Sequence, residues 1–262
     1  MILSSHAYPA DRALPALAAV FLAAALAFSA LPAVGADTRW RLDLESGAVF
    51  SGYNNIAIPG DTGTRFSLSE DFKTTSGYFY RLRLTWQMAT RHSLSVLYAP
   101  LKLSASGVSP FPIQFFGADF PAGASIRGTF MFNSYRLTYR YELVANDKWK
   151  IGIGITAKIR DAAVGLEGGG LRAEKTNVGF VPLLNARVEH RLSPKFGLLL
   201  EADALAAPQG RAEDVLLAIL YRFSPTLTLK AGYRFVEGGA DNDEVYNFTF
   251  ISYASIGFLI DF

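Results

Sequence analysis

The sequence ends in EVYNFTFISYASIGFLIDF, residues 244–262, and this stretch decides the fold. Side chains of a β-strand point alternately to its two faces, so the stretch divides into two sets. One set is apolar and largely aromatic: Tyr246, Phe248, Phe250, Ala254, Ile256, Phe258, Ile260 and Phe262. The other set is mostly polar, with two aliphatic members: Asn247, Thr249, Ile251, Tyr253, Ser255, Gly257, Leu259 and Asp261. The alternation predicts a strand with one apolar and one mainly polar face, ending in an aromatic residue.

The N-terminal segment has the features of an export signal. Residues 14–31 form an apolar run rich in Ala, Leu and Phe, and the small residues Val34, Gly35 and Ala36 follow it. The run approaches the length of a membrane-spanning helix, which is the alternative interpretation. The small residues at its end and its high alanine content favour a cleaved signal peptide at residues 1–36. The mature chain would then comprise residues 37–262.

The same two-residue alternation recurs along the whole mature chain. At residues 149–160 it is clearest, because Ile151, Ile153 and Ile155 alternate with Gly152, Gly154 and Thr156. Ten segments are predicted as strands: 39–51, 77–88, 93–103, 129–143, 149–160, 177–192, 196–204, 214–223, 227–235 and 244–262. Four tight links (89–92, 144–147, 193–194 and 224–225) alternate with five mostly longer links (53–76, 104–128, 161–176, 206–213 and 237–243).

These features together resemble those of small bacterial outer-membrane β-barrel proteins. The resemblance covers the mature chain and rests on the export signal, the alternation and the terminal Phe262. It implies an all-β fold, a transmembrane antiparallel up-and-down β-barrel of about ten strands with short periplasmic turns and longer outer loops. It also implies export through the periplasm, integration among outer-membrane lipids and lipopolysaccharide, and recognition of Phe262 by the barrel-assembly machinery.

A soluble β-sandwich is the alternative to a barrel. Its two sheets would turn their apolar faces inward and their polar faces to water. Here the large aliphatic side chains are backed by charged ones, which suits a barrel with lipid outside and a polar interior. Cysteine is absent, which excludes disulfides and cysteine-based sites. The net charge of +2 is too small to indicate nucleic-acid binding, and no cofactor is predicted.

The interior of such a barrel would be highly charged. The predicted interior network consists of Arg81, Arg83, Arg136, Arg140, Lys158, Arg160, Arg187, Glu201, Asp203, Lys230 and Arg234. Unpaired charges are costly away from water, so the bases are expected to pair with carboxylates. Barrels of about eight strands are filled by side chains, whereas porins of about sixteen leave a channel. We therefore expect a largely filled interior, or at most a narrow passage with an anion preference.

Histidine chemistry at the outer rim is excluded. Some small outer-membrane barrels are enzymes that use a histidine near that rim, and the omptin-like proteases share the ten-strand count. This chain has His6 in the signal peptide, and His92 and His190 near the predicted periplasmic ends of strands.

Carboxylate chemistry stays open. Glu201 and Asp203 lie two residues apart on one face, about 7 Å from each other by strand rise. Two close carboxylates can divide the roles of acid and base. The structural alternative is that they neutralise Lys158, Arg160 or Arg234.

Two loops carry further candidate residues. Residues 110–121 are unusually aromatic, with Phe111, Phe115, Phe116 and Phe120. Exposed apolar patches mark interaction sites, so this loop is expected to cover the barrel mouth as a lid, to lie on the outer leaflet, or to contact a partner. An acidic run supplies possible oxygen ligands for a divalent cation, although it also suits a solvated loop. Its members are Asp241, Asp243 and Glu244.

Two hypotheses about function follow. The first is an integral outer-membrane barrel with a charged, largely filled interior, acting as a structural or adhesive component or a narrow channel. The alternative is an outer-membrane surface hydrolase, acting on lipopolysaccharide, lipid or peptide, that uses Glu201 and Asp203.

Overall fold

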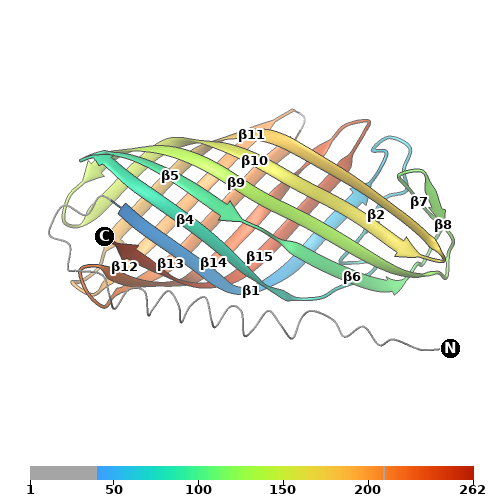
Figure 1. The fold of residues 1–262 in the computed structure, drawn as a ribbon, viewed down its shortest axis with the longest axis horizontal. Helices are drawn as coiled ribbons and strands as arrows, with labels where there is room; N and C mark the ends of the chain where they lie inside the picture. The colour runs from blue at the N-terminus through green and yellow to red at the C-terminus, as the bar shows by residue number, and fades with distance from the viewer. Residues whose placement is uncertain (1–39, 209) are drawn as a thin grey trace. The chain divides into compact units, whose positions relative to one another are not determined.

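The computed structural model describes residues 40–208 and 210–262, which form a closed antiparallel β-barrel of ten strands (Figure 1). The predicted fold class is confirmed. The predicted signal peptide, residues 1–36, lies outside the described residues. The barrel strands are β1 (Trp40–Ala57), β4 (Gly77–Ala89), β5 (His92–Ala99) continued by β6 (Lys102–Val108), β9 (Ser125–Ala145), β10 (Trp149–Gly168), β11 (Leu171–Arg191), β12 (Phe196–Ala207), β13 (Gly210–Arg222), β14 (Leu227–Asp241) and β15 (Tyr246–Asp261).

The C-terminal strand closes the barrel against the first strand. β15 pairs with β1 from Arg41 opposite Asp261 to Ala57 opposite Tyr246, with a bulge in β1 between Ser51 and Asn54. The backbones of Trp40 and Phe262 exchange two hydrogen bonds of 3.0 Å. This seam removes the exposed strand edges that a membrane interior would not tolerate.

Several strands are longer than the sequence predicts. β10 and β11 continue through predicted link 161–176 to a tight turn at Gly169 and Gly170, whose φ angles of 58° and 80° favour glycine. The other predicted links at 206–213 and 237–243 are also mostly strand. The apolar alternation stops there because the outward side chains become polar, as at Arg172 and Glu174, while backbone pairing continues.

Two excursions remain as genuine loops beyond the strands. Residues 58–76 contain β2 (Phe66–Ser67), which pairs with β1, and β3 (Lys73–Thr74), which pairs with β6. Residues 109–124 contain a small separate hairpin of β7 (Ile113–Phe115) and β8 (Ala118–Phe120). Pro100 interrupts the third barrel strand, as expected of a residue without a backbone N–H.

The outer wall carries a belt of exposed apolar side chains. Ile155 of β10 is 64% exposed, whereas its neighbour Thr156 points into the barrel and is 2% exposed. At the end of the barrel with the tight turns, Trp40 stacks on Trp86 and Trp149 stacks on His190. Such aromatic pairs at strand ends are typical of a membrane interface. The belt therefore has the side chains that lipid requires.

Within the described residues, no helix is both long and apolar enough to cross a membrane.

The assignment of the two faces can be tested by a charge on the belt. Ile155→Arg should destabilise the barrel in lipid vesicles by about 2–4 kcal/mol, because a charge at the bilayer midplane loses its hydration. The control is Thr176→Arg on β11, an exposed outward position above the belt, with an expected cost of about 0–1 kcal/mol. Urea unfolding measures both. Equal costs would show that the belt is not the lipid-facing surface.

Candidate functional site

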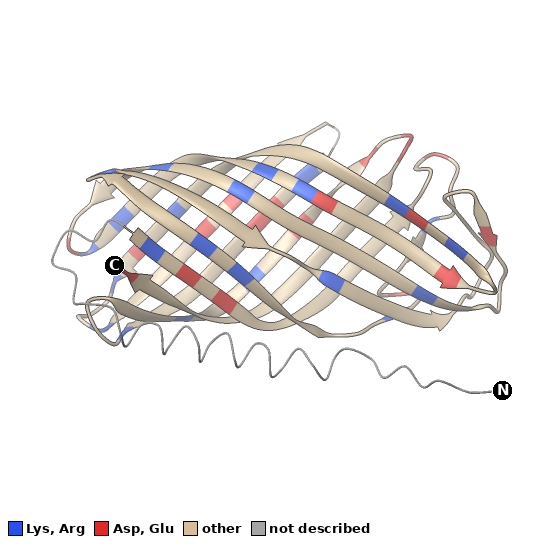
Figure 2. Cartoon of the chain, in the orientation of Figure 1, with Lys and Arg blue, Asp and Glu red and all other residues tan. Residues whose placement is uncertain are grey.

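The middle of the barrel is filled by buried ion pairs between opposite walls. Figure 2 shows basic and acidic positions on neighbouring strands in this part of the barrel. Asp214 at the start of β13 accepts hydrogen bonds from Arg81 at 2.8 Å and from Arg136 at 2.6 Å. It also pairs with Arg234. One carboxylate thus joins three arginines from β4, β9 and β14.

Glu201 and Asp203 occupy the same network. Glu201 pairs with Arg83 and, at 3.3 Å, with Arg140, and Arg187 lies 3.7 Å from its second oxygen. The polar partners of Asp203 are a guanidinium, an amide and a hydroxyl. They are Arg136 at 2.7 Å, Asn185 at 2.7 Å and Thr156 at 2.8 Å. Both carboxylates are buried and surrounded by donors.

A second cluster neutralises the wall formed by β1 and β14. The Lys230 amine donates to Asp43 at 2.6 Å and to Glu45 at 2.7 Å, and its side chain is completely buried. Arg234 donates two hydrogen bonds to the Glu45 carboxylate, at 2.7 and 2.8 Å. Bidentate pairs of this kind are among the strongest charge-assisted hydrogen bonds.

The structure places all the predicted interior residues inside the barrel, but several pairings differ from the prediction. Glu201 and Asp203 do not pair with Lys158, Arg160 or Arg234. Among the described residues no carboxylate lies within ion-pair distance of Lys158, whose amine sits 4.7 Å from the Phe132 ring centre. Arg160 instead binds the Asn177 amide oxygen.

Sequence reasoning also missed Asp214, which pairs with three arginines. The sequence could have predicted that Asp214 points inward, because its neighbour Val215 is an outward residue and successive side chains alternate between the faces. The partners themselves follow from the closure of the barrel. Alternation assigns a residue to a face, but it does not say which residue stands opposite across the interior.

The aromatic hairpin seals the barrel mouth. Ile113, Phe115 and Phe120, which we call the mouth plug, are completely buried in the upper core. Phe111 is partly buried against the same core, whereas Phe116 is 47% exposed and lies near the Lys175 amine. Three positions were considered for this loop: in the barrel mouth, on the outer leaflet, or against a partner. The structure places its buried residues in the barrel mouth.

The hairpin is held by the neighbouring excursion, residues 58–76. The Phe116 N–H donates to the Ile58 carbonyl at 2.7 Å. Gln114 exchanges two hydrogen bonds of 3.0 Å with Thr64. The two loops therefore form one connected cap over the barrel.

Two small cavities lie in the region of the plug and the ion pairs. A cavity of about 10 Å³ lies among Asp43, Glu45 and the arginines beside them. Another of about 10 Å³ lies beneath the plug, beside Pro100 and Tyr253. Each has room for about one water molecule. These cavities do not form a passage.

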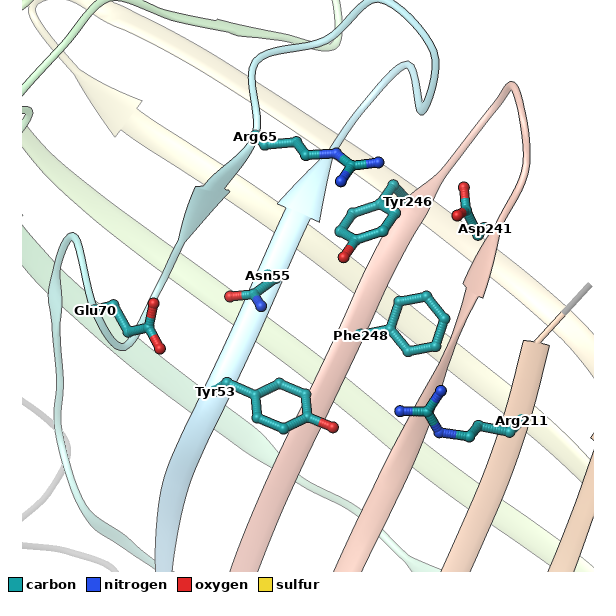
Figure 3. Close-up of a pocket in the computed structure, with 8 residues that line it drawn as sticks. All are labelled: Tyr53, Asn55, Arg65, Glu70, Arg211, Asp241, Tyr246 and Phe248. Atoms are coloured by element: carbon teal, nitrogen blue, oxygen red, sulfur yellow. The ribbon is translucent and has the colours of Figure 1, made fainter.

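A larger cleft opens on the outer face of the wall at the rim, and we call it the rim cleft (Figure 3). Its volume is about 490 Å³. Its lining residues come from β1, β13, β14, β15 and the loop at 58–76: Tyr53, Asn55, Arg65, Glu70, Arg211, Asp241, Tyr246 and Phe248. Asn54 and Thr249, which alternate with the lining residues of β1 and β15, point inward and are buried. The cleft therefore faces outward.

The rim cleft lies above the apolar belt. Phe248 is about 46 Å along β15 from Phe262, or about 35 Å in height at a strand tilt of about 40°. The apolar band of a transmembrane barrel is only about 25 Å tall. The lining side chains are therefore beyond the membrane-spanning part of the strands.

Aromatic rings and charged groups are interleaved in the rim cleft. The Arg65 guanidinium lies 4.0 Å from the centre of the Tyr246 ring, and that of Arg211 lies 5.0 Å from the centre of the Phe248 ring. Arg211 also binds Glu237 through two hydrogen bonds of 2.8 Å. These hydrogen bonds raise the pKa of Arg211 above its usual value.

Tyr53 completes this set of contacts, since its hydroxyl donates to Glu237. Partial burial and this hydrogen bond raise the pKa of Tyr53 above its ordinary value. Among the described residues, no ion pair engages Arg65, Glu70 or Asp241. Nothing in the sequence indicated the cleft, because the ends of four strands and the loop at 58–76 build it together.

The acidic run does not gather into a metal site. Asp241 lines the rim cleft, while the backbone carbonyl of Asp243 accepts a hydrogen bond from the Gly60 N–H at 2.9 Å. The Asn242 side chain closes the turn by accepting from the N–H groups of Glu244 and Val245. Across residues 40–208 and 210–262 no group of three or more potential metal-binding side chains comes together.

The comparisons with known proteins identify the fold. No protein-family model matches the sequence, and no curated protein matches it either. The outer membrane protease OmpT from Escherichia coli is similar in structure, with a TM-score of 0.54 at 9% identity over 86% of this chain and 97% of that one. The transport unit of the Escherichia coli autotransporter AIDA-I matches with a TM-score of 0.49 at 9% identity, over 93% of this chain and 97% of that one. Together with its closed ring of strands, the likeness to OmpT shows that the chain has the fold of bacterial outer-membrane β-barrels.

The contribution of the ion-pair network to the stability of the barrel can be measured by a substitution at Asp214. Asp214→Asn keeps the shape of the side chain but leaves three buried arginines short of a countercharge, and it should cost about 3–5 kcal/mol of stability. Urea unfolding in vesicles measures the change. Glu174→Gln is the control, since its pair with Arg172 is largely exposed and should contribute about 0–1 kcal/mol. A small effect at both positions would mean that the network does not hold the barrel together.

Proposed function

We propose that the protein is an integral outer-membrane barrel with a closed interior, which acts through its wall and rim as a structural or adhesive component. In this proposal residues 1–36 direct export, Phe262 is read by the barrel-assembly machinery, and lipids and lipopolysaccharide surround the wall. The exposed apolar belt supports the location, because water would disfavour such a surface.

The filled interior is the observation that carries the proposal. Two barriers of different chemistry lie in series: the mouth plug and the ion-pair network beneath it. A solute would have to displace buried aromatic rings and then break buried ion pairs. Breaking one buried pair by removing a partner costs about 3–5 kcal/mol, so a permanent passage is disfavoured.

The hydrolase alternative has less support. Glu201 and Asp203 are each held by arginines and lie beneath the mouth plug, where no substrate has access. The rim cleft brings charged groups together at the accessible rim, and it is the better place to look for recognition.

Planar-bilayer recording tests the proposal. The intact protein should show no steady conductance above the lipid background, because both barriers are present. Replacing residues 110–121 by a short Gly-Ser linker should leave it closed, since the ion-pair network remains. Adding Arg136→Ala, Asp214→Ala and Arg234→Ala should open a measurable conductance, because these substitutions remove three connected side chains from the centre of the barrel.

A control changes a single aromatic ring outside the mouth plug. Phe116→Ala removes a half-exposed ring outside the mouth plug and should behave like the intact protein. Large, unselective conductance of the intact protein would overturn the proposal.

A further inference from the structure

The rim cleft combines three features that point to a ligand. It is open to the outside, it contains aromatic faces, and among residues 40–208 and 210–262 no ion pair neutralises its Arg65, Glu70 or Asp241. At about 35 Å above the periplasmic end of β15, it stands in the layer occupied by lipid headgroups and the sugars attached to them. The chemistry of its lining can be compared with the chemistry of that layer.

The hydrogen-bonding groups of the rim cleft are of both kinds. Arg65 and Arg211 supply N–H donors, Glu70 and Asp241 supply carboxylate acceptors, and the Asn55 amide supplies one of each. A hydroxyl both donates and accepts, so a ligand rich in hydroxyls can satisfy the whole set. A group that only accepts would leave the two carboxylates without partners and would be repelled by them.

The charge balance separates hydroxyl recognition from phosphate recognition. Arg211 already holds Glu237 in a bidentate pair, and Arg65 shares the lining of the cleft with two carboxylates, Glu70 and Asp241. The rim cleft therefore has no positive excess. Phosphate sites depend on such an excess, commonly through arginine forks that have no competing acid.

The aromatic rings complete the arrangement. Figure 3 shows Tyr53, Tyr246 and Phe248 around the cleft, with the two arginines at its upper and lower ends. The face of an aromatic ring carries a partial negative charge, so it attracts the weakly positive C–H groups on the flat side of a pyranose ring. A few polar groups around apolar rings are the usual composition of a small-molecule site.

We propose that the rim cleft binds saccharide units, with the rings stacking on the sugar faces and the polar groups binding the hydroxyls. This inference rests on the proposed outer-membrane location, which puts the cleft beside the saccharides of the outer leaflet. The same sugar chemistry occurs in glycolipid of the surrounding membrane and in free or neighbouring-cell glycans. The first source lies at the height of the cleft, and the test distinguishes the two.

The experiment measures binding of core oligosaccharide released from enterobacterial rough-type lipopolysaccharide, in phosphorylated and enzymatically dephosphorylated forms. The full mature chain is refolded into vesicles and titrated by calorimetry. The test variants are Phe248→Ala and Arg65→Ala. Their matched controls are Phe180→Ala and Arg172→Ala, which change the same residue types at exposed outward positions of β11.

The dephosphorylated oligosaccharide should bind the unmodified protein, and each test variant should weaken binding by about tenfold or more. The controls should stay within about twofold of the unmodified protein. Arg65 has no ion pair to lose, so Arg65→Ala keeps the test valid even where Phe248→Ala disturbs the rim. Tighter binding of intact lipopolysaccharide in the same vesicle would assign the site to membrane glycolipid, and equal binding would assign it to free glycans.

Two results would overturn the inference. In one, the test and control variants bind equally well, so the rim cleft is not the site. In the other, only the phosphorylated form binds and inorganic phosphate displaces it, so phosphate rather than sugar is recognised. Conductance is measured independently, so an open pore with sugar binding intact would defeat the proposed function alone.

Discussion

The neutrality of the barrel interior is the constraint on which the structure depends. A closed wall satisfies its own backbone hydrogen bonds but turns half of its side chains toward a narrow space. Here that half carries many bases and acids, and removing even one charge from water without a partner is costly. Asp214 and Glu201 meet the constraint because each receives guanidinium groups from different strands. Gly152 helps in a different way, since a Cβ there would lie 2.7 Å from the Arg140 side chain.

The same constraint explains the two layers of the interior. Charged side chains fill the part of the barrel inside the membrane, where ion pairs are protected from water. Above the membrane the strands continue, and the mouth plug replaces charge by aromatic packing. Phe115 and Phe120 gain from burial there at a place where water would otherwise enter the barrel. In a barrel closed in this way, the side chains that can meet a ligand lie on the outer surface. In the rim cleft, polar and aromatic side chains gather on that surface.

The rim cleft depends on strands that continue beyond the membrane. Tyr246 and Phe248 lie on the outward face of β15, in the same alternation that turns Phe258 toward lipid. Extending the strand beyond the membrane gives that alternation a second use, because an aromatic side chain above the belt meets sugars and water instead of acyl chains. The loop at 58–76 then adds Arg65 and Glu70, so that recognition combines a rigid wall with one folded excursion.

The sequence by itself determined the class of fold and the faces of the predicted strands. Two-residue alternation in a chain with few interruptions predicts strands, and the position of Glu201 within it already places that carboxylate inside. The aromatic run at 110–121 was also evident before its place was known. Only the tertiary structure decided that Glu201 meets Arg83 and Arg140, that β10 and β11 continue past residue 160, and that Arg65 joins Tyr246. The physical reason is that alternation is local, whereas a partner across the interior or on a neighbouring loop depends on strand register and tilt, which closing the ring of strands determines.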